Sequence, residues 1–178
     1  HPAWKTADGT GGWGGDYGPP TAACVAGDTV VLGWTGHEAG WGIIGVDLDG
    51  RKKWGAKQKN TAHLATDGKR FFAPAEHGSK EVCVYAVDNA QPLAFGNGRQ
   101  GLQPPPGGDD EEDNAPTGIA YSKGKIYVSF VARDLIGVYG AEQGNLQTTW
   151  KVSQPVCLAI ANDGALLAVS RDRVVRVL

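Results

Sequence analysis

The sequence predicts an all-β fold assembled from several copies of one small antiparallel sheet. Glycine occurs 27 times in the 178 residues and is spread among short runs of Val, Ile and Leu, a distribution typical of many short strands joined by turns. In addition, one strand-turn-strand pattern recurs along the chain at a spacing near 40 residues. Repeats of this length and type indicate a β-propeller, in which each blade is a four-stranded sheet.

The first half of the repeat is a short apolar strand, a turn that contains glycine, and a second apolar strand. It occurs four times, as TAACVAGDTVVL, TAHLATDGKRFF, PTGIAYSKGKIYV and PVCLAIANDGALLAV. The glycines of the four copies are 41, 56 and 40 residues apart, at Gly27, Gly68, Gly124 and Gly164. The longer middle interval indicates an insertion between the second and third copies.

The second half of the repeat is a third strand, a polar turn and an aromatic residue that closes a fourth strand. Trp54, Phe95 and Trp150 follow the glycines of their copies by 27, 27 and 26 residues. Agreement at both ends of the unit favours a propeller over an open antiparallel sandwich with coincidental spacing. We therefore expect about four blades of four antiparallel strands.

The repeat divides the chain, which is expected to be a single propeller domain or a fragment of one. The expected segments are blade one at 21–55, blade two at 61–96, an acidic Pro/Gly insertion at 97–115, blade three at 116–152 and an incomplete blade four at 155–178. The last of these ends in RVVRVL, which reads as a third strand, so an outer strand is missing from its end of the chain.

The N-terminal segment is expected to supply that outer strand. The stretch PAWKT resembles TTWKV, the fourth strand of blade three, and this similarity places Trp4 where Trp150 stands. Residues 1–6 then complete the last blade, and residues 7–20 form a glycine-rich loop. Either the chain is a four-bladed ring closed by its termini, or it is part of a larger propeller. The lack of methionine, even at position 1, favours the second arrangement.

Composition excludes some partners. A net charge of −2 gives no electrostatic attraction to nucleic acid or to an anionic membrane, and no stretch is long and apolar enough for a membrane span. The spacing of Cys24, Cys83 and Cys157 matches no zinc or haem motif, so we interpret each as a small core residue. The sequence leaves their disulfide state open.

Two repeat units resemble known propeller families. GVDLDGRKKW resembles the repeat of pyrroloquinoline-quinone-type propellers, in which a strand ending in Ala-x-Asp precedes a Gly-Lys turn and a docking Trp. LAIANDGALLAVSRDRVVRVL resembles the NHL and YVTN repeats. The resemblance implies the propeller fold but no quinone chemistry, because the chain lacks the adjacent cysteine pair that lies beside the cofactor in the quinoprotein alcohol dehydrogenases. No cofactor is expected, and a quinone is the alternative.

The longest loops are expected on one side of the propeller. With the first strand of each blade innermost, the connections between second and third strands and those between blades share one side, and loops on a rigid scaffold concentrate binding groups. Three tryptophans belong to these loops, namely Trp13, Trp34 and Trp41. Their indoles suit stacking on sugar rings or packing on an apolar partner, and the alternative is that they pack within the glycine-rich loops and hold them in shape.

Charged and imidazole side chains form the other candidates on these loops. Two neighbouring pairs stand at matching places in consecutive blades, His37 with Glu38 and Glu76 with His77. Metal ligation is one interpretation, and solvated loop residues are the favoured one. The five acids at 109–113 raise calcium as an alternative, yet the spaced ligands of an EF-hand are absent from the sequence, and a solvated loop is favoured.

An Arg-Asp pair repeats between the second and third strands of blades three and four. The arginines are Arg133 and Arg171, followed by Asp134 and Asp172. Such a pair either anchors its loop by hydrogen bonds to backbone, which is the favoured interpretation, or lines the central opening for an anionic or hydroxylated ligand.

These observations favour a non-enzymatic binding or scaffold module that presents its loop-rich side to a protein or glycan partner, in an extracellular or periplasmic setting. One alternative is a propeller enzyme with its site at the central opening, either a quinoprotein-like oxidoreductase or a carbohydrate hydrolase or lyase. The other is a structural component of a cell-surface assembly. Further propeller blades, from a longer chain or a neighbouring subunit, are an additional candidate partner.

Overall fold

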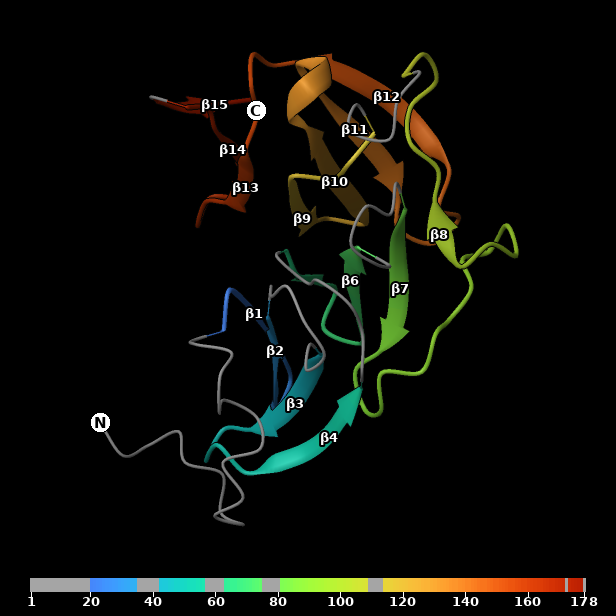
Figure 1. The fold of residues 1–178 in the computed structure, drawn as a ribbon, viewed down its shortest axis with the longest axis vertical. Coiled ribbons are helices and arrows are strands. Elements are labelled where there is room, and N and C mark those ends of the chain that lie inside the picture. Colours follow the sequence, from blue (N-terminus) through green and yellow to red (C-terminus); the bar gives the residue numbers. More distant parts are fainter. Residues whose placement is uncertain are drawn as a thin grey trace.

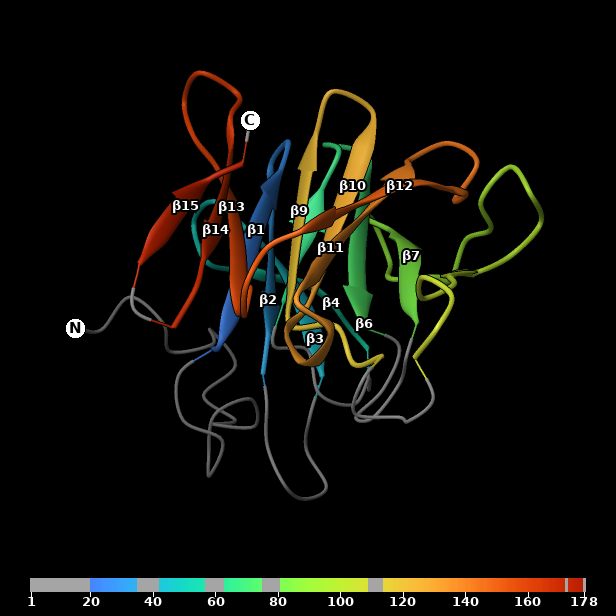
Figure 2. The same cartoon turned by 90° about the horizontal axis from the view of Figure 1, so that it is seen from above.

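The structure is a computed structural model that describes residues 20–34, 42–56, 63–74, 81–108, 114–171 and 173–177. Within these ranges, fifteen short strands form four antiparallel sheets, and the only helix is a 3-10 turn, η2 (Val131–Arg133). The sheets follow one another around a common centre, as two perpendicular views show (Figures 1 and 2). The chain is therefore a four-bladed β-propeller, and the predicted fold class is confirmed.

The strands of each sheet follow in chain order. Blade 1 consists of β1 (Ala22–Ala26), β2 (Thr29–Gly33), β3 (Ile43–Asp47) and β4 (Lys52–Ala56). Blade 2 consists of β5 (Ala65–Thr66), β6 (Arg70–Pro74), β7 (Val82–Ala86) and β8 (Gly101–Leu102). Blade 3 consists of β9 (Gly118–Ser122), β10 (Lys125–Phe130), β11 (Leu135–Gly140) and β12 (Leu146–Lys151). Blade 4 consists of β13 (Cys157–Ile160), β14 (Leu166–Val169) and β15 (Val174–Arg176).

A glycine recurs at the same place in each repeat because the turn there needs a backbone conformation with positive φ. Each lies in the turn between the first two strands of its blade, with φ of 60° at Gly27, 90° at Gly68, 75° at Gly124 and 85° at Gly164. This left-handed region carries no steric cost for glycine alone. At the first three positions an added Cβ has nothing within 4 Å, so the turn geometry, rather than close packing, calls for glycine.

The first strand of each blade lies innermost. β1 contacts β5, β5 contacts β9, and β9 contacts β13. The fourth strands β4, β8 and β12 lie at the periphery (Figure 1). The expected placement of the long loops on one side of the propeller depends on this radial order.

The core is divided among the junctions between successive blades, with one apolar cluster at each of the three junctions. Successive residues of a strand point to opposite faces of its sheet, so every central blade serves two junctions. Phe71 and Phe72 of β6 illustrate this, because Phe71 packs with residues of blade 1 and Phe72 with residues of blade 3. Both rings are fully buried.

The fourth strand of blade 2 lies farther along the chain than the repeat indicates. β8 pairs with β7 from within the segment 97–115 that the sequence analysis treats as an insertion. Before it, only an isolated bridge joins Pro92 to Tyr85. Proline lacks the N-H that a continuous ladder needs, so the chain leaves the sheet after this bridge and returns nine residues later, at Gly101.

The closing aromatics nevertheless pack at the junctions. Trp54 in β4 donates its indole N-H to the carbonyl oxygen of Val87 in the next blade, at 2.8 Å. Trp150 in β12 packs against the cluster between blades 3 and 4. Phe95 lies outside the regular strands, yet its ring stacks on Phe72 with 6.4 Å between centroids. Residues 1–19 lie outside the described residues, so the outer strand around Trp4 stays a prediction.

Candidate functional site

Most of the residues that the sequence analysis nominates for a site lie outside the described part of the chain. These are Trp13, His37, Glu38, Trp41, Glu76 and His77, together with residues 109–113 and Asp172. The roles assigned to them stay predictions. Trp34, Arg133 and Arg171 are described.

Trp34 is a packing residue of blade 1. Its side chain is 9 % exposed and belongs to a small apolar cluster with Leu32, Ile44 and Val46. Stacking on a sugar ring needs an exposed indole face, so this geometry supports the packing interpretation over ligand stacking.

Arg133 anchors the loop that joins blades 2 and 3. It ends η2, in the connection between β10 and β11. Its guanidinium donates through Nη1 to the carbonyl oxygen of Pro105 at 2.6 Å and to Oδ1 of Asn114 at 2.9 Å, and through Nη2 to the carbonyl oxygen of Pro106 at 2.7 Å. Charge-assisted hydrogen bonds of this kind are short and strong. The geometry is that of the loop-anchoring interpretation.

Asp134 stabilises the connection between β12 of blade 3 and β13 of blade 4. It has φ of 51°, in the left-handed region that aspartate tolerates better than most residues. Its Oδ1 accepts the backbone N-H of Gln154 at 2.7 Å, and its carbonyl oxygen accepts that of Val152 at 2.9 Å. The Arg133-Asp134 pair therefore fixes both the loop that enters blade 3 and the loop that leaves it.

Tyr139 adds a third anchor, which the sequence analysis did not nominate. Its hydroxyl donates to the carbonyl oxygen of Gln103 at 2.8 Å, at the start of the same loop that Arg133 holds. The side chain is buried, and this burial raises the pKa of the phenol well above its usual range. The sequence signal is a departure from the repeat, since Tyr139 stands where Asp47 and Asp88 stand in blades 1 and 2.

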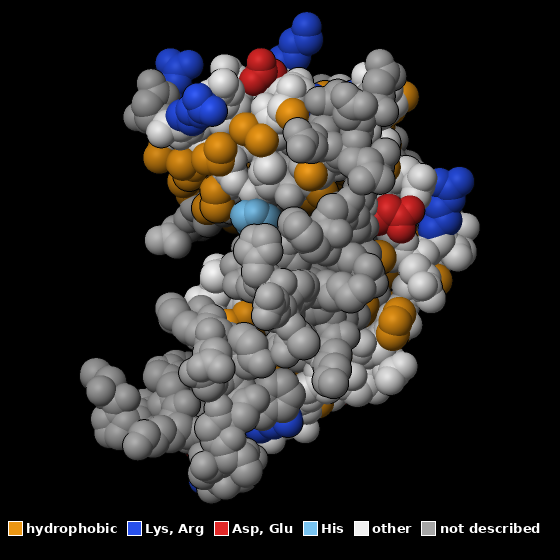
Figure 3. Space-filling view, in the orientation of Figure 1, with side chains coloured by type: hydrophobic (Ala, Val, Ile, Leu, Met, Phe, Trp, Pro, Cys, Tyr) orange, Lys and Arg blue, Asp and Glu red, His pale blue; other side chains and the backbone are white. Residues whose placement is uncertain are grey.

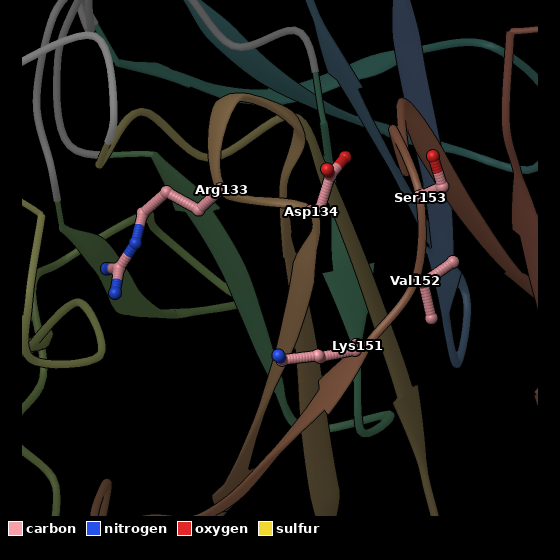
Figure 4. A pocket seen from close by; sticks show the side chains of 5 residues that line it. All are labelled: Arg133, Asp134, Lys151, Val152 and Ser153. Atoms are coloured by element: carbon pink, nitrogen blue, oxygen red, sulfur yellow. The ribbon is translucent and has the colours of Figure 1, made fainter.

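A shallow hollow of about 430 Å³ lies beside the anchor (Figure 4). It is lined by Arg133, Asp134, Lys151, Val152 and Ser153. Figure 4 shows that these side chains point in different directions and do not converge on one position. A site that encloses a small molecule needs a concave wall and convergent polar groups. The hollow is better suited to be one part of a broad contact surface.

Arg171 is exposed and is not among the residues that line the hollow. It follows Ser170, whose buried hydroxyl donates to the carbonyl oxygen of Ser153 at 2.7 Å. This hydrogen bond links blade 4 to the loop that leaves blade 3, next to Arg171 in the sequence.

The cysteines and acids provide little metal chemistry within the described ranges. No three His, Cys, Asp or Glu side chains there are grouped so that they could hold a metal ion. Cys24, Cys83 and Cys157 are free thiols, and burial raises the pKa of the Cys24 thiol to about 12. The interpretation of all three as core residues is wrong for Cys157, which lies exposed on β13. In the part of the chain that the structure describes, no helix is long and apolar enough to cross a membrane.

Comparison with solved structures finds other β-propellers. The computationally designed Ika4 protein superposes with a TM-score of 0.60 at 20 % identity, over 89 % of this chain and 91 % of that one. The Cps50 (Swd1) β-propeller domain of Myceliophteria thermophila gives a TM-score of 0.69 at 16 % identity, over 89 % and 52 %. BamB from Moraxella catarrhalis gives 0.58 at 14 % identity, over 85 % and 41 %.

These likenesses concern the fold. The chain spans about half or less of the two natural propellers and nearly all of Ika4. No protein-family profile matches the sequence, and no sequence among curated proteins matches it.

Proposed function

We propose that this propeller is a non-enzymatic binding or scaffold module whose loop side, over blades 2 to 4, contacts a protein partner. The observation that carries the proposal is the double anchor at Arg133 and Asp134. One guanidinium fixes the loop before blade 3, and the adjacent residue fixes the loop after it. Loops that are ordered before binding lose less conformational entropy when a partner docks.

The character of this surface fits a protein better than a glycan. Pro106 is exposed beside the Arg133 guanidinium, and Lys151, which lines the hollow, and Arg171 are exposed as well. An apolar ring next to cationic side chains matches a protein surface with acidic and apolar residues. The glycan hypothesis depends on three indoles, and one of them, Trp34, is buried in blade 1.

Photo-crosslinking in the cells that produce the protein tests the proposal. Benzoyl-phenylalanine is placed at Pro106 on the loop side or, as the matched control, at Leu48. Leu48 is 70 % exposed in the turn between β3 and β4, at the opposite ends of the strands. We expect one reproducible protein adduct from position 106 and none from position 48.

The same experiment in an Arg133→Met background tests the anchor itself. Loss of three hydrogen bonds releases the loop, so the adduct should weaken several-fold while the fold persists by circular dichroism. Equal adducts from both positions, or an adduct that is indifferent to Arg133→Met, would contradict the proposal.

The enzyme alternative is tested on the purified native protein. A quinoprotein-like oxidoreductase shows the visible absorbance of a bound quinone, whereas a binding module shows only the absorbance of its tryptophans and tyrosines. We expect the second spectrum. The kinship of the repeat with quinoprotein, NHL and YVTN units stays a hypothesis.

A further inference from the structure

Blade 4 packs through only one of its two faces. Leu158 and Leu166 point toward blade 3 and are buried in the junction cluster. Strand register places Cys157 opposite Val169, and Val169 opposite Val174, on the other face. Cys157 is exposed, and Val174 is 63 % exposed. A row of apolar side chains thus crosses all three strands without cover from a neighbouring blade.

The second row of this face is apolar on its two inner strands. Ala159 is exposed and pairs with Leu167, which is half-buried. Arg176 ends the row on β15, where it is paired with Asp163 at 2.9 Å. We call Cys157, Ala159, Leu167, Val169 and Val174 the free face of blade 4. Figure 3 shows apolar side chains gathered on the lobe that blade 4 occupies, beside an indentation of the molecular surface.

Blade 1 has a corresponding uncovered region at the other end of the series. Its residues toward blade 2, such as Val31 and Ile43, are fully buried. On the opposite side of the sheet, Ala23 and Val25 of the inner strand β1 are exposed, the latter to 59 %, and Val30 is half-buried. Farther out on the same side, Leu32, Ile44 and Val46 are buried in a cluster of their own, so the uncovered region is the inner part of the face. We call Ala23, Val25 and Val30 the free face of blade 1.

The two free faces are not packed on each other. Among the described residues, none of the four apolar clusters contains side chains of both blade 1 and blade 4. Figure 1 shows these two blades on either side of an opening, with blades 2 and 3 joining them on the far side. Within the described ranges, the free face of blade 4 and the exposed side of the inner strand of blade 1 therefore have no neighbouring blade against them.

Both free faces continue the pattern of the established junctions. At the junction of blades 3 and 4, the inner strand of the earlier blade offers the small Ala120, and that of the later blade offers Leu158. On its inner strand, the free face of blade 4 presents the small Cys157 and Ala159, as blade 3 presents Ala120 at its junction with blade 4. The free face of blade 1 presents the branched Val25, as blade 4 presents Leu158 at that junction.

We propose that a second copy of this chain covers both free faces, with blade 4 of each copy packed against blade 1 of the other. Two-fold symmetry makes the two junctions identical and joins two arcs of four blades into one closed ring. Each new junction pairs small residues of one inner strand with a branched residue of the other, as the junction of blades 3 and 4 does. A second copy brings both required faces at once, whereas a partner with one matching face leaves the other uncovered.

Light scattering after size-exclusion chromatography tests the proposal. We expect the 178-residue chain to have twice its 18.7 kDa mass at micromolar concentration. Val174→Asp and Val25→Asp each place a charge in both junctions of the dimer, and either should raise its dissociation constant about 100-fold or more. Leu48→Asp is the control, because Leu48 is equally apolar and exposed but lies in a turn outside both free faces.

Mixing the two variants distinguishes this ring from other dimers. In a heterodimer, one junction holds both aspartates and the other is wild-type, so the mixture should dimerise more tightly than either variant alone. Circular dichroism and cooperative thermal unfolding show that each variant is folded. A monomer at every concentration would overturn the proposal, and would favour closure within the chain or blades from elsewhere. A dimer that survives Val174→Asp or Val25→Asp, or that Leu48→Asp dissociates, would overturn it as well.

Discussion

The junction between blades 2 and 3 and the free face of blade 4 come from the same strand pattern, with apolar side chains on alternate residues. In the junction, Phe72, Val84 and Ile126 have no exposed surface. On the free face, Val174 keeps 63 % of its surface exposed, although it occupies the third strand of its blade as Val84 does. The two regions differ in whether a neighbouring blade lies against them.

This difference shows where the stability of the propeller lies. Burial of apolar surface contributes roughly 25 cal/mol for each Å², so a face contributes only when a second face covers it. Charge adds little across the same junction. Arg70 of blade 2 pairs with Glu142 of blade 3 at 2.8 Å, but Glu142 is 81 % exposed, and pairs of this kind contribute at most about 1 kcal/mol.

The largest loss is expected from Phe72→Ala at the junction of blades 2 and 3. The ring is fully buried and stacks on Phe95 and Tyr121, at centroid distances of 6.4 Å and 6.0 Å. Removing it leaves a cavity between two sheets that cannot collapse independently, so the free energy of unfolding should fall by about 3–5 kcal/mol. Chemical denaturation measures the loss, and a value below about 1 kcal/mol would show that the junction is not tightly packed.

A smaller loss is expected from Gly144→Ala in the same junction. Gly144 has φ of 65°, and an added Cβ would lie 2.6 Å from Cγ of Phe95. Left-handed strain of roughly 1 kcal/mol and a clash of about 1–3 kcal/mol add to about 2–4 kcal/mol. Gly124→Ala is the matched control, since it has φ of 75° and nothing within 4 Å of the new Cβ. Equal costs at the two positions would remove the clash with Phe95 from the explanation.

The repeat predicted the parts of the fold that local geometry determines. The turn glycines were predictable because each of these turns needs a positive φ at the glycine, as at Gly27 and Gly164. The position of Trp54 was predictable for a similar reason, since strand length fixes the spacing from turn to closing aromatic. Strand β8 was missed because Pro92 interrupts the ladder and the pairing resumes only after an irregular segment.

The partners of Arg133 were beyond prediction for a different reason. Its location in a connection was evident, but the carbonyl groups of Pro105 and Pro106 meet it only once blades 2 and 3 have packed. Likewise, alternation along β13 shows which residues share a face with Cys157 but not whether another sheet covers that face. Contacts between blades depend on the whole ring, and a repeat reports only one unit.

A pH-dependent effect is expected from Asp67→Asn, which removes the ion pair between Asp67 and Arg70 within blade 2. Burial raises the pKa of Asp67, but hydrogen bonds from the backbone N-H groups of Arg70 and Lys69, together with the Arg70 guanidinium, lower it by more. Its folded pKa therefore lies below that of an unfolded aspartate, about 3.9. The carboxylate stabilises the fold above that pH, and this contribution is lost as the pH falls through the folded pKa.

Asparagine keeps an acceptor for the backbone N-H groups and loses the charged partner of Arg70. The substitution should cost about 1–2 kcal/mol at pH 7 and progressively less below about pH 4, where the wild-type carboxyl is itself protonated. Denaturation from pH 7 down to the lowest pH at which the chain stays folded measures the difference. A cost that is the same at both ends of this range would show that the charge of Asp67 contributes nothing.

The smallest effect is expected from Val174→Ala, and the same deletion at Val84 makes the comparison direct. Val84→Ala removes two methyl groups from a fully buried site and should cost about 2 kcal/mol, whereas Val174→Ala in dilute solution should stay within about 0.5 kcal/mol. If a second copy covers the free face, the cost at Val174 must rise with protein concentration, because only the dimer buries that side chain. The cost at Val84 has no such dependence, since blade 3 covers it in the monomer. Thermal denaturation over a hundredfold range of concentration measures both, and a cost at Val174 that matches Val84 at the lowest concentration would mean that the chain itself already covers this face.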